Sequence, residues 1–234
     1  AMLLVSSPAA SEPDGSLERQ LEEVFDIANE EYKAGNYKDA VQLYEGIFSA
    51  FNVKDADIYY NLGNSYFKLN QYGKAIASYK RALRLSPRQQ DILANLRIVR
   101  DLTKDKVDSP KSTELLHEVF FFHYGLSKAE SETVFLIVYC LSALFGITVL
   151  FRKSRAIRWV LTASVAATVI FGLSTFVHAY RDAQPAQAVV TVAETKVHTG
   201  PGDTYLASFL LHDGAELEIQ DRMDDWYQVE LADG

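Results

Sequence analysis

Two long apolar segments separated by a short basic one constrain the fold of this chain more than any other feature. Residues 133–151 and 159–177 are 19 residues each and contain no charged side chain. At about 1.5 Å of rise per residue, a helix of this length crosses the roughly 30 Å hydrocarbon core of a bilayer. The segment between them, 152–158, is too short to fold alone. We therefore predict a two-helix transmembrane hairpin, with the soluble parts before and after it on the same side of the membrane.

The loop of this hairpin carries the charges that predict its orientation. Its cations are Arg152, Lys153, Arg155 and Arg158. The outer flanks carry fewer cations, and acidic residues accompany them, as Glu130 accompanies Lys128. Because loops rich in lysine and arginine stay in the cytoplasm, these charges predict a cytoplasmic loop and place both termini on the other side of the membrane.

The N-terminal residues support the same topology. They read Ala-Met-Leu-Leu-Val-Ser-Ser-Pro-Ala-Ala-Ser, a short apolar stretch followed by small residues. This order is typical of the end of an export signal with its cleavage region, although no basic segment precedes it. We interpret residues 1–15 as the remnant of an export signal or, alternatively, as a disordered leader.

The distribution of charge argues against nucleic-acid binding. Residues 181–234 contain 11 acidic side chains against 3 lysines and arginines, so their excess equals the formal net charge of −8 of the whole chain. An acidic region repels phosphate backbones, and no basic stripe with interleaved aromatic residues occurs elsewhere. We expect no nucleic acid among the partners.

Residues that carry chemistry are sparse. The single cysteine, Cys140, lies inside the first apolar segment, so no disulfide within the chain is expected. The five histidines are scattered, and none stands at zinc-ligand spacing from a cysteine or another histidine. No phosphate-binding loop and no nucleophile elbow occurs. We therefore expect no catalytic residue, no metal and no cofactor, and a protein that is not an enzyme.

The segment before the membrane contains an internal repeat. Residues 21–52 align with residues 55–88 at a period close to 34. In the second copy, large, small and turn residues follow one known pattern: Tyr59, Asn61, Leu62, Gly63, Tyr66, Tyr72, Ala75, Tyr79, Ala82 and Pro87. This pattern resembles the tetratricopeptide repeat, which implies paired antiparallel helices stacked into a solenoid. The first copy is looser, and Ala28 stands where the second copy has Gly63.

Elementary packing supports the same interpretation. Gly63 and Ala75 are small where two helices have to approach closely. Pro87 ends the last helix of the repeats, because proline removes a helix hydrogen bond. We predict an all-α tetratricopeptide repeat domain over residues 16–108, with repeats at about 21–54 and 55–88 and a capping helix at 90–104.

The resemblance to the repeat family also implies where a partner binds, because the first helix of each pair lines a concave groove. The residues at the corresponding positions are Glu22, Phe25, Asn29, Tyr32, Lys33, Asp57, Tyr60, Asn64, Phe67 and Lys68. We predict that they form a partner-binding groove. The alternative is that the aromatic residues serve packing and the charges form a solvated face. Asn29 and Asn61 stand where some members clamp a peptide carboxylate, but Phe25 replaces the lysine of that clamp, which argues against one.

The membrane segments and the residues just before them are predicted to act as an anchor. In residues 112–124, phenylalanines and leucines are mixed with acidic residues and histidines, which favours an amphipathic helix in the membrane interface. An ordinary helix packed on the repeat domain is the alternative. The two apolar segments contain small residues suited to helix packing and no ionisable residue deep inside. We therefore expect contact with membrane lipid and no ion transport.

The last segment changes to short alternating runs that indicate strands at Val190 and Val192, 195–198, 206–211, 216–220 and 226–231. The string KVHTGPGDTY, residues 196–205, resembles the signature of bacterial SH3-like domains, with His198 in place of the usual arginine. We predict a small all-β SH3-like barrel over residues 188–234. Its ligand candidates, which equally suit a barrel core, are Tyr205, Trp226 and Tyr227. The Gly-Trp strand with which the family continues is absent, which suggests a truncated or incomplete domain.

The order of parts, with an export signal, tetratricopeptide repeats, two membrane spans and an SH3-like domain, resembles the BatE-type proteins of bacterial aerotolerance (Bat) operons. The fold class is accordingly a multidomain membrane protein. The resemblance implies a non-enzymatic scaffold or adaptor in the bacterial inner membrane, with both termini periplasmic and a role in stress or oxygen tolerance. It implies partners among membrane-anchored von Willebrand A-domain Bat proteins, in a system with a MoxR-type AAA+ ATPase. The alternative function is an envelope sensor that binds peptidoglycan through the SH3-like domain.

Overall fold

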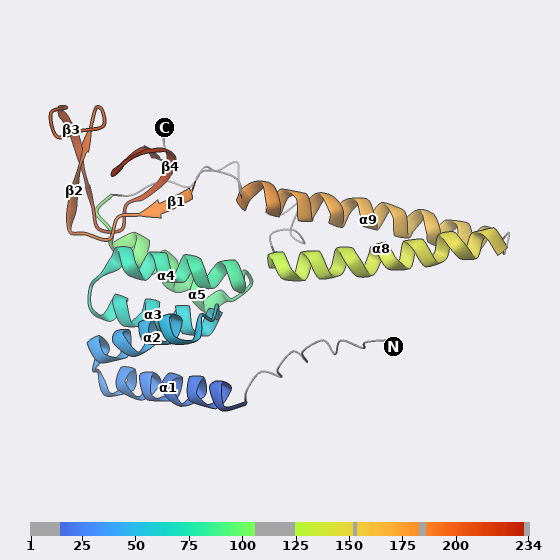
Figure 1. Cartoon of the computed structure of the whole chain (residues 1–234), viewed down its shortest axis with the longest axis horizontal. Coiled ribbons are helices and arrows are strands. Elements are labelled where there is room, and N and C mark those ends of the chain that lie inside the picture. The colour runs from blue at the N-terminus through green and yellow to red at the C-terminus, as the bar shows by residue number, and fades with distance from the viewer. Residues whose placement is uncertain (1–14, 106–124, 152–153, 183–185, 232–234) are drawn as a thin grey trace, which may run out of the picture.

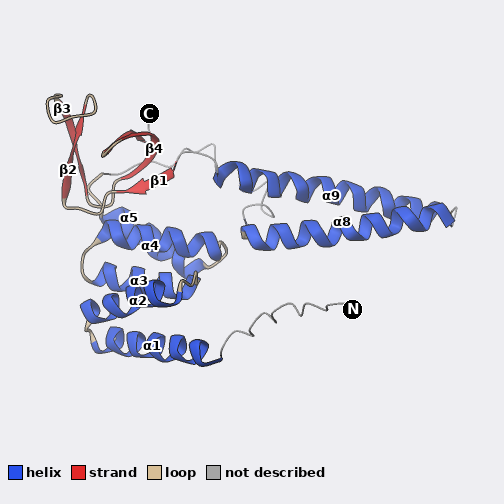
Figure 2. Ribbon diagram, viewed as in Figure 1, coloured by secondary structure: helices blue, strands red, loops and turns tan. Residues whose placement is uncertain are grey.

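Stacked helices, a long helical pair and two small sheets follow one another along the chain (Figures 1 and 2). The computed structural model describes residues 15–105, 125–151, 154–182 and 186–231. Most of the predicted leader and the whole predicted interfacial helix at 112–124 lie outside these residues. The stacked helices are α1 (Gly15–Ala34), α2 (Tyr37–Phe51), α3 (Ala56–Lys68), α4 (Tyr72–Leu85) and α5 (Gln90–Leu102).

Short turns with defined chemistry separate the stacked helices. Gly35 and Asn70, with φ of 87° and 58°, adopt the left-handed conformation that ends α1 and α3. Asp55 caps the start of α3, since its carboxylate accepts hydrogen bonds from the backbone N–H groups of Asp57 and Ile58 at 2.8 and 3.0 Å. Helix α4 ends at Leu85, before Pro87, as the sequence predicted. Each helix then contacts its successor, from α1 to α5.

The core of the helical domain is built around a close approach of α3 and α4. The ring of Tyr79 lies against Gly63, where an added Cβ would stand 2.6 Å from a ring carbon. Tyr44 holds the corresponding place in the first helical pair, and both rings are fully buried. The predicted small residue at Gly63 is therefore explained by the aromatic ring that packs on it.

The long pair consists of α8 (Lys128–Phe151) and α9 (Arg155–Asp182), which run side by side and project away from the stacked helices (Figure 1). Hydroxyl groups meet across the pair, as Ser142 Oγ lies 2.9 Å from Thr168 Oγ1. The ring of Phe135 lies over Gly172. Both helices are long and apolar enough to cross a membrane, and most of their side chains are exposed.

The connection between α8 and α9 is shorter than the sequence predicted. Helix α9 begins at Arg155, so Arg155 and Arg158 lie in its first turn and not in a free loop. The carbonyl of Ser154 accepts a hydrogen bond from the N–H of Arg158 at 3.3 Å. Helix α8 likewise begins before Thr133, at Lys128. The apolar run sets the length that suits a bilayer, but charged residues are good helix formers and extend both helices beyond it.

Two antiparallel sheets occur within residues 186–231. One has the order β1 (Ala186–Val189), β4 (Glu216–Met223), β5 (Trp226–Leu231), and the other pairs β2 (Glu194–His198) with β3 (Ala207–His212). Both contribute to one apolar core, in which Leu211 of β3 lies with Leu217 of β4. Closure of these sheets into an SH3-like barrel stays a prediction.

The first strand lies earlier than the sequence predicted, since β1 ends at Val189. Val190 pairs instead with the turn between β3 and β4. Its N–H donates to the carbonyl of Ala215 at 2.9 Å, and its carbonyl accepts from the N–H of Gly214 at 2.8 Å. Val192, also predicted in the strand, is 53% exposed. The strand ends because its partner β4 begins only at Glu216, so no further ladder is available to it.

The sheets dock on α4 and α5 through one carboxylate and two cations. Glu216 accepts hydrogen bonds from Lys80 Nζ at 2.7 Å and from Arg100 Nε and Nη2 at 2.5 and 2.8 Å. Burial raises the pKa of Glu216, but the Arg100 hydrogen bonds and the Lys80 charge outweigh burial and hold this pKa below its ordinary value. The backbone N–H of His212 adds a hydrogen bond to Asp105 Oδ2 at 2.6 Å.

Glycines on both sides allow this docking. A Cβ at Gly73, in the first turn of α4, would collide with the backbone carbonyl of Val190. A Cβ at Gly214 would collide with Thr103, and its φ of 91° is one that residues with side chains rarely adopt. The turn between β3 and β4 thus lies directly on the helices, and the helical domain and the sheets pack as one unit.

Substitution of Gly63 tests the close packing of α3 on α4. Gly63→Ala is expected to destabilise the helical domain by about 1–3 kcal/mol, because the added methyl group has to displace the ring of Tyr79. Gly46→Ala is the matched control, since Gly46 also lies inside a helix but has no atom within 4 Å of an added Cβ. That control should gain about 0.5–1 kcal/mol. Urea denaturation followed by circular dichroism measures both, and equal effects would contradict the packing.

The docking of the sheets is expected to depend on pH. Because the pKa of docked Glu216 is lowered, its contribution is fully present above the ordinary carboxyl pKa and is lost as pH falls through the lowered value. The protection of backbone amides in α5 and β4, measured as the exchange rate relative to the intrinsic rate at the same pH, should therefore fall below about pH 4. Glu216→Gln should produce the same loss of protection at neutral pH.

Glu218→Gln is the control for this experiment. Glu218 lies on the same strand, is exposed and forms no ion pair within the described part of the chain. Its substitution should leave the exchange of α5 unchanged. Exchange that responds equally to both substitutions would show that the Glu216 ion pairs do not hold the sheets in place.

Candidate functional site

Helices α1, α3 and α5 surround a hollow of about 230 Å³. Its lining residues are Tyr32, Tyr60, Asn64, Phe67, Lys68, Tyr79, Asn95, Ile98 and Val99. The C-terminal parts of all three helices contribute, so these helices run in the same direction, and Tyr79 reaches the hollow from α4. A concave surface made by successive first helices of a repeat is the candidate binding site.

The same hydrogen-bond pattern occurs in both repeats at this site. In the first, Asn29 Oδ1 accepts from Tyr44 Oη at 2.7 Å and from Asn61 Nδ2 at 2.9 Å. The bond between Asn61 and Asn29 engages both of the asparagines with which a carboxylate clamp would have to bind its ligand. In the second, Asn64 Oδ1 accepts from Tyr79 Oη at 2.7 Å and from Asn95 Nδ2 at 2.9 Å.

These contacts orient the side-chain amides. The oxygen of Asn29 and the oxygen of Asn64 each accept two hydrogen bonds, which occupies both lone pairs. The Nδ2 groups of the same two residues form no hydrogen bond within the described residues, and both side chains are half-buried. Two equivalent N–H donors, one per repeat, are therefore held in fixed positions on the groove.

The two tyrosines that bond the asparagines act as hydrogen-bond donors and not as ionised groups. Burial and the neighbouring Tyr32 raise the pKa of Tyr44 to about 12. Burial, Tyr60 and Tyr32 also raise the pKa of Tyr79. Both phenols therefore stay neutral hydrogen-bond donors near neutral pH. Among the described residues, no group of three or more His, Cys, Asp or Glu side chains could hold a metal ion.

Charges mark the two edges of the groove. Lys33 and Lys68 lie in the last turns of α1 and α3, and both are exposed. Glu22 and Asp57 lie toward the opposite ends of these helices and are exposed as well. A bound segment therefore meets exposed lysines where α1 and α3 end, beside the hollow. It meets exposed carboxylates where these helices begin.

The structure brings together half of the predicted groove residues in the hollow: Tyr32, Tyr60, Asn64, Phe67 and Lys68. Asn29 lies outside the hollow and holds the hydrogen-bond network of the first repeat. The ring of Phe25 packs beside Tyr44 at a centroid distance of 6.1 Å. Glu22, Lys33 and Asp57 do not line the hollow.

The sequence prediction missed the third wall of the site, made by Asn95, Ile98 and Val99 of α5. The prediction treated this helix as a cap. The available signal was the period, since Asn95 follows Asn61 by one repeat length and forms the equivalent hydrogen bond to the first helix of the preceding repeat. Helix α5 is therefore the first helix of a further half-repeat.

The ligand candidates of the sheet region do not converge. His198 lies between two of them, because its Nδ1 is 3.0 Å from the Tyr205 carbonyl and its ring is 5.3 Å from the ring of Trp226. Tyr227 follows Trp226 in β5 and so points to the opposite face, where Arg222 lies over its ring. His198 thus contacts the ring of Trp226 but only the backbone of Tyr205. Tyr227 lies on the other face of β5 from Trp226.

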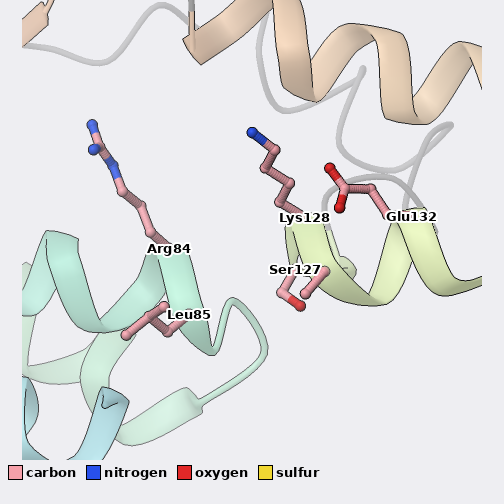
Figure 3. Close-up of a pocket in the computed structure, with 6 residues that line it drawn as sticks. Arg84, Leu85, Ser127, Lys128 and Glu132 are labelled. Carbon is pink, nitrogen blue, oxygen red and sulfur yellow. The ribbon is translucent and has the colours of Figure 1, made fainter. Parts of the chain in front are cut away.

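A second hollow, of about 260 Å³, lies where α4 approaches the start of α8 (Figure 3). Arg84 and Lys128 extend to the same side of it, and Glu132 lies beside Lys128. The ion pair between Arg88 Nη2 and Glu130 Oε1, at 2.7 Å, joins α8 to the segment after α4. This region is a joint between the helical domain and the long pair, and its cations and carboxylates largely offset each other.

Comparison with known proteins identifies the repeat. Residues 56–89 match the family model of the tetratricopeptide repeat. The chain therefore contains this repeat, and its helical domain is a scaffold for protein–protein interaction. A search of curated proteins finds no match. The crystal structure of PcrH in complex with the chaperone binding region of PopD aligns with 67% of this chain and 93% of that chain, at 15% identity and a TM-score of 0.34.

Proposed function

We propose that this protein is a non-enzymatic, membrane-anchored adaptor that binds an extended segment of a partner protein between α1, α3 and α5. The observation that carries the proposal is the pair of oriented amides at Asn29 and Asn64. Each presents an N–H donor at the same place in successive repeats. A segment that crosses these helices in an extended conformation has free backbone carbonyls that can accept from such donors, so the groove binds main chain as well as side chains.

The long pair α8–α9 is proposed to anchor this scaffold in a bilayer. Its outward side chains are apolar along the length, including Leu144, Leu173 and Phe176, which are 55%, 60% and 65% exposed. An apolar surface of this extent is costly in water and favourable in lipid. The polar contacts, such as Ser142 with Thr168, lie between the helices, where a membrane pair places them.

The wider assignment combines these parts. The sheets are proposed to be an SH3-like domain that lies beside the groove and contacts a second partner. The order of domains supports a BatE-type role in the inner membrane of a bacterium, with both termini periplasmic. The proposed partners are von Willebrand A-domain membrane proteins, in a system with a MoxR-type AAA+ ATPase that serves stress or oxygen tolerance.

A triple variant, Tyr60→Ala, Asn64→Asp and Phe67→Ala, tests the groove. Full-length protein in detergent is incubated with solubilised membranes of the source cells, and recovered proteins are quantified by mass spectrometry. We expect recovery of the specific partner to fall by about tenfold or more, because aromatic anchors carry most of such binding. Asn64→Asp keeps the oxygens that accept from Tyr79 and Asn95, so the helical packing is retained.

The matched control for this variant is Lys38→Ala combined with Gln42→Ala. Both residues are exposed on α2 and do not line the hollow. Recovery should then equal that of the original protein. Partner recovery that is unchanged in the triple variant would exclude the groove as the binding site.

The proposed topology is tested by cysteine labelling in a Cys140→Ser background. An impermeant maleimide applied to spheroplasts should label the Ser208→Cys variant, whose residue is exposed on β3. The Ser154→Cys variant, in the connection between α8 and α9, should react only after the membrane is permeabilised. The reverse labelling pattern would place the modules in the cytoplasm, and labelling of both sites in intact spheroplasts would contradict a spanning hairpin.

A further inference from the structure

The hollow between α1, α3 and α5 has walls that indicate what kind of side chain it takes. Tyr32 and Phe67 contribute aromatic side chains to its lining, and Ile98 and Val99 contribute aliphatic ones. Ile98 is 50% exposed, so an apolar rim is open to a ligand. A volume of about 230 Å³ leaves room for one large apolar side chain. Burial of such a side chain is worth roughly tenfold to a hundredfold in affinity.

A cation stands beside this apolar surface. Lys68 lines the hollow, is exposed and forms no ion pair within the described part of the chain. Asp101 of α5 is exposed and is not paired with it. The other acidic groups of the groove, Glu22 and Asp57, lie toward the opposite edge. A ligand carboxylate is therefore attracted to the edge of Lys68 and repelled from the other.

The amide of Asn64 indicates the backbone conformation of the ligand. Its Nδ2 donor lies one helical turn before Lys68 and can bond a main-chain carbonyl, since its oxygen is already occupied. A helical ligand uses its carbonyls internally, whereas an extended one leaves them free. In an extended segment, residues rise by about 3.3 Å, so a side chain near Lys68 is one or two positions from the one in the hollow.

Building on the proposed peptide-binding function, we propose a specific ligand class for this hollow. It takes one large apolar side chain, leucine, methionine or phenylalanine, of an extended protein segment that carries aspartate or glutamate one or two positions away. Lys68 binds the acidic side chain, and Asn64 binds the intervening backbone. The segment is internal to its protein, because Asn29 and Asn61 bond each other and leave no clamp for a terminal carboxylate.

The test uses a phage library of random twelve-residue peptides fused through their C-termini, selected on the detergent-solubilised full chain. Peptides that combine a large apolar residue with a nearby acidic one are expected to be enriched. A synthetic peptide of the selected sequence then gives a Kd by fluorescence anisotropy. Replacement of its apolar residue by alanine should weaken binding by roughly tenfold or more.

Charge recognition is measured with Lys68→Gln and with the peptide's acidic residue replaced by its amide. Each change should weaken binding by about fivefold, and the two together by no more than either alone. Lys38→Gln is the control, since Lys38 is an exposed lysine of α2 outside the hollow, and it should leave the Kd unchanged. Circular dichroism verifies that each variant folds. We expect no change in the spectrum, because both lysines are exposed.

The outcomes separate this inference from the function on which it rests. Selected peptides that lack the apolar and acidic pair, or whose binding is insensitive to Lys68→Gln, would overturn the ligand class while peptide binding stands. Selection of no peptide by the folded protein would overturn both the ligand class and the groove function. Enrichment only of peptides with a free C-terminal carboxylate, in a parallel library, would overturn the internal segment.

Discussion

The packing of Tyr79 against Gly63 links the stability of this protein to its binding site. The ring fills the space between α3 and α4 that only a residue without a side chain leaves open. The hydroxyl of the same tyrosine reaches through to Asn64 and holds its amide in place. Because burial also keeps this phenol neutral, its donor function does not vary near neutral pH. The ring of Tyr79 therefore packs in the core while its hydroxyl group orients a residue of the groove. Tyr44 makes the equivalent contact with Asn29.

Helix α5 lies between the groove and the sheets. One part of it carries Asn95 and Ile98 into the hollow, and Arg100 bonds Glu216 of β4. A solenoid this short has an open end that exposes apolar surface, and the docked sheets cover it where a further helix would otherwise pack. The position of the binding wall thus depends on a contact between residues that are 116 positions apart in the chain.

The long pair follows a different physical rule from the rest of the molecule. In the helical domain, apolar side chains point inward and polar ones outward, as water requires. In α8 and α9, apolar side chains cover the outer surface, and the hydroxyls of Ser142 and Thr168 meet inside. This inversion is the basis on which we propose a bilayer as the environment of the pair, where small residues would pack between the helices.

The local elements follow from the sequence alone: the repeat period, the end of α4 before Pro87 and the two apolar helices. Their signals are short-range, because spacing along a helix decides which residues share a face. Three features depend on the folded arrangement: α5 forms a wall of the site, Val190 pairs with a turn, and Glu216 joins Lys80 and Arg100. These contacts depend on how separate modules pack, and a lone carboxylate or an exposed isoleucine has no local pattern that reveals its distant partner.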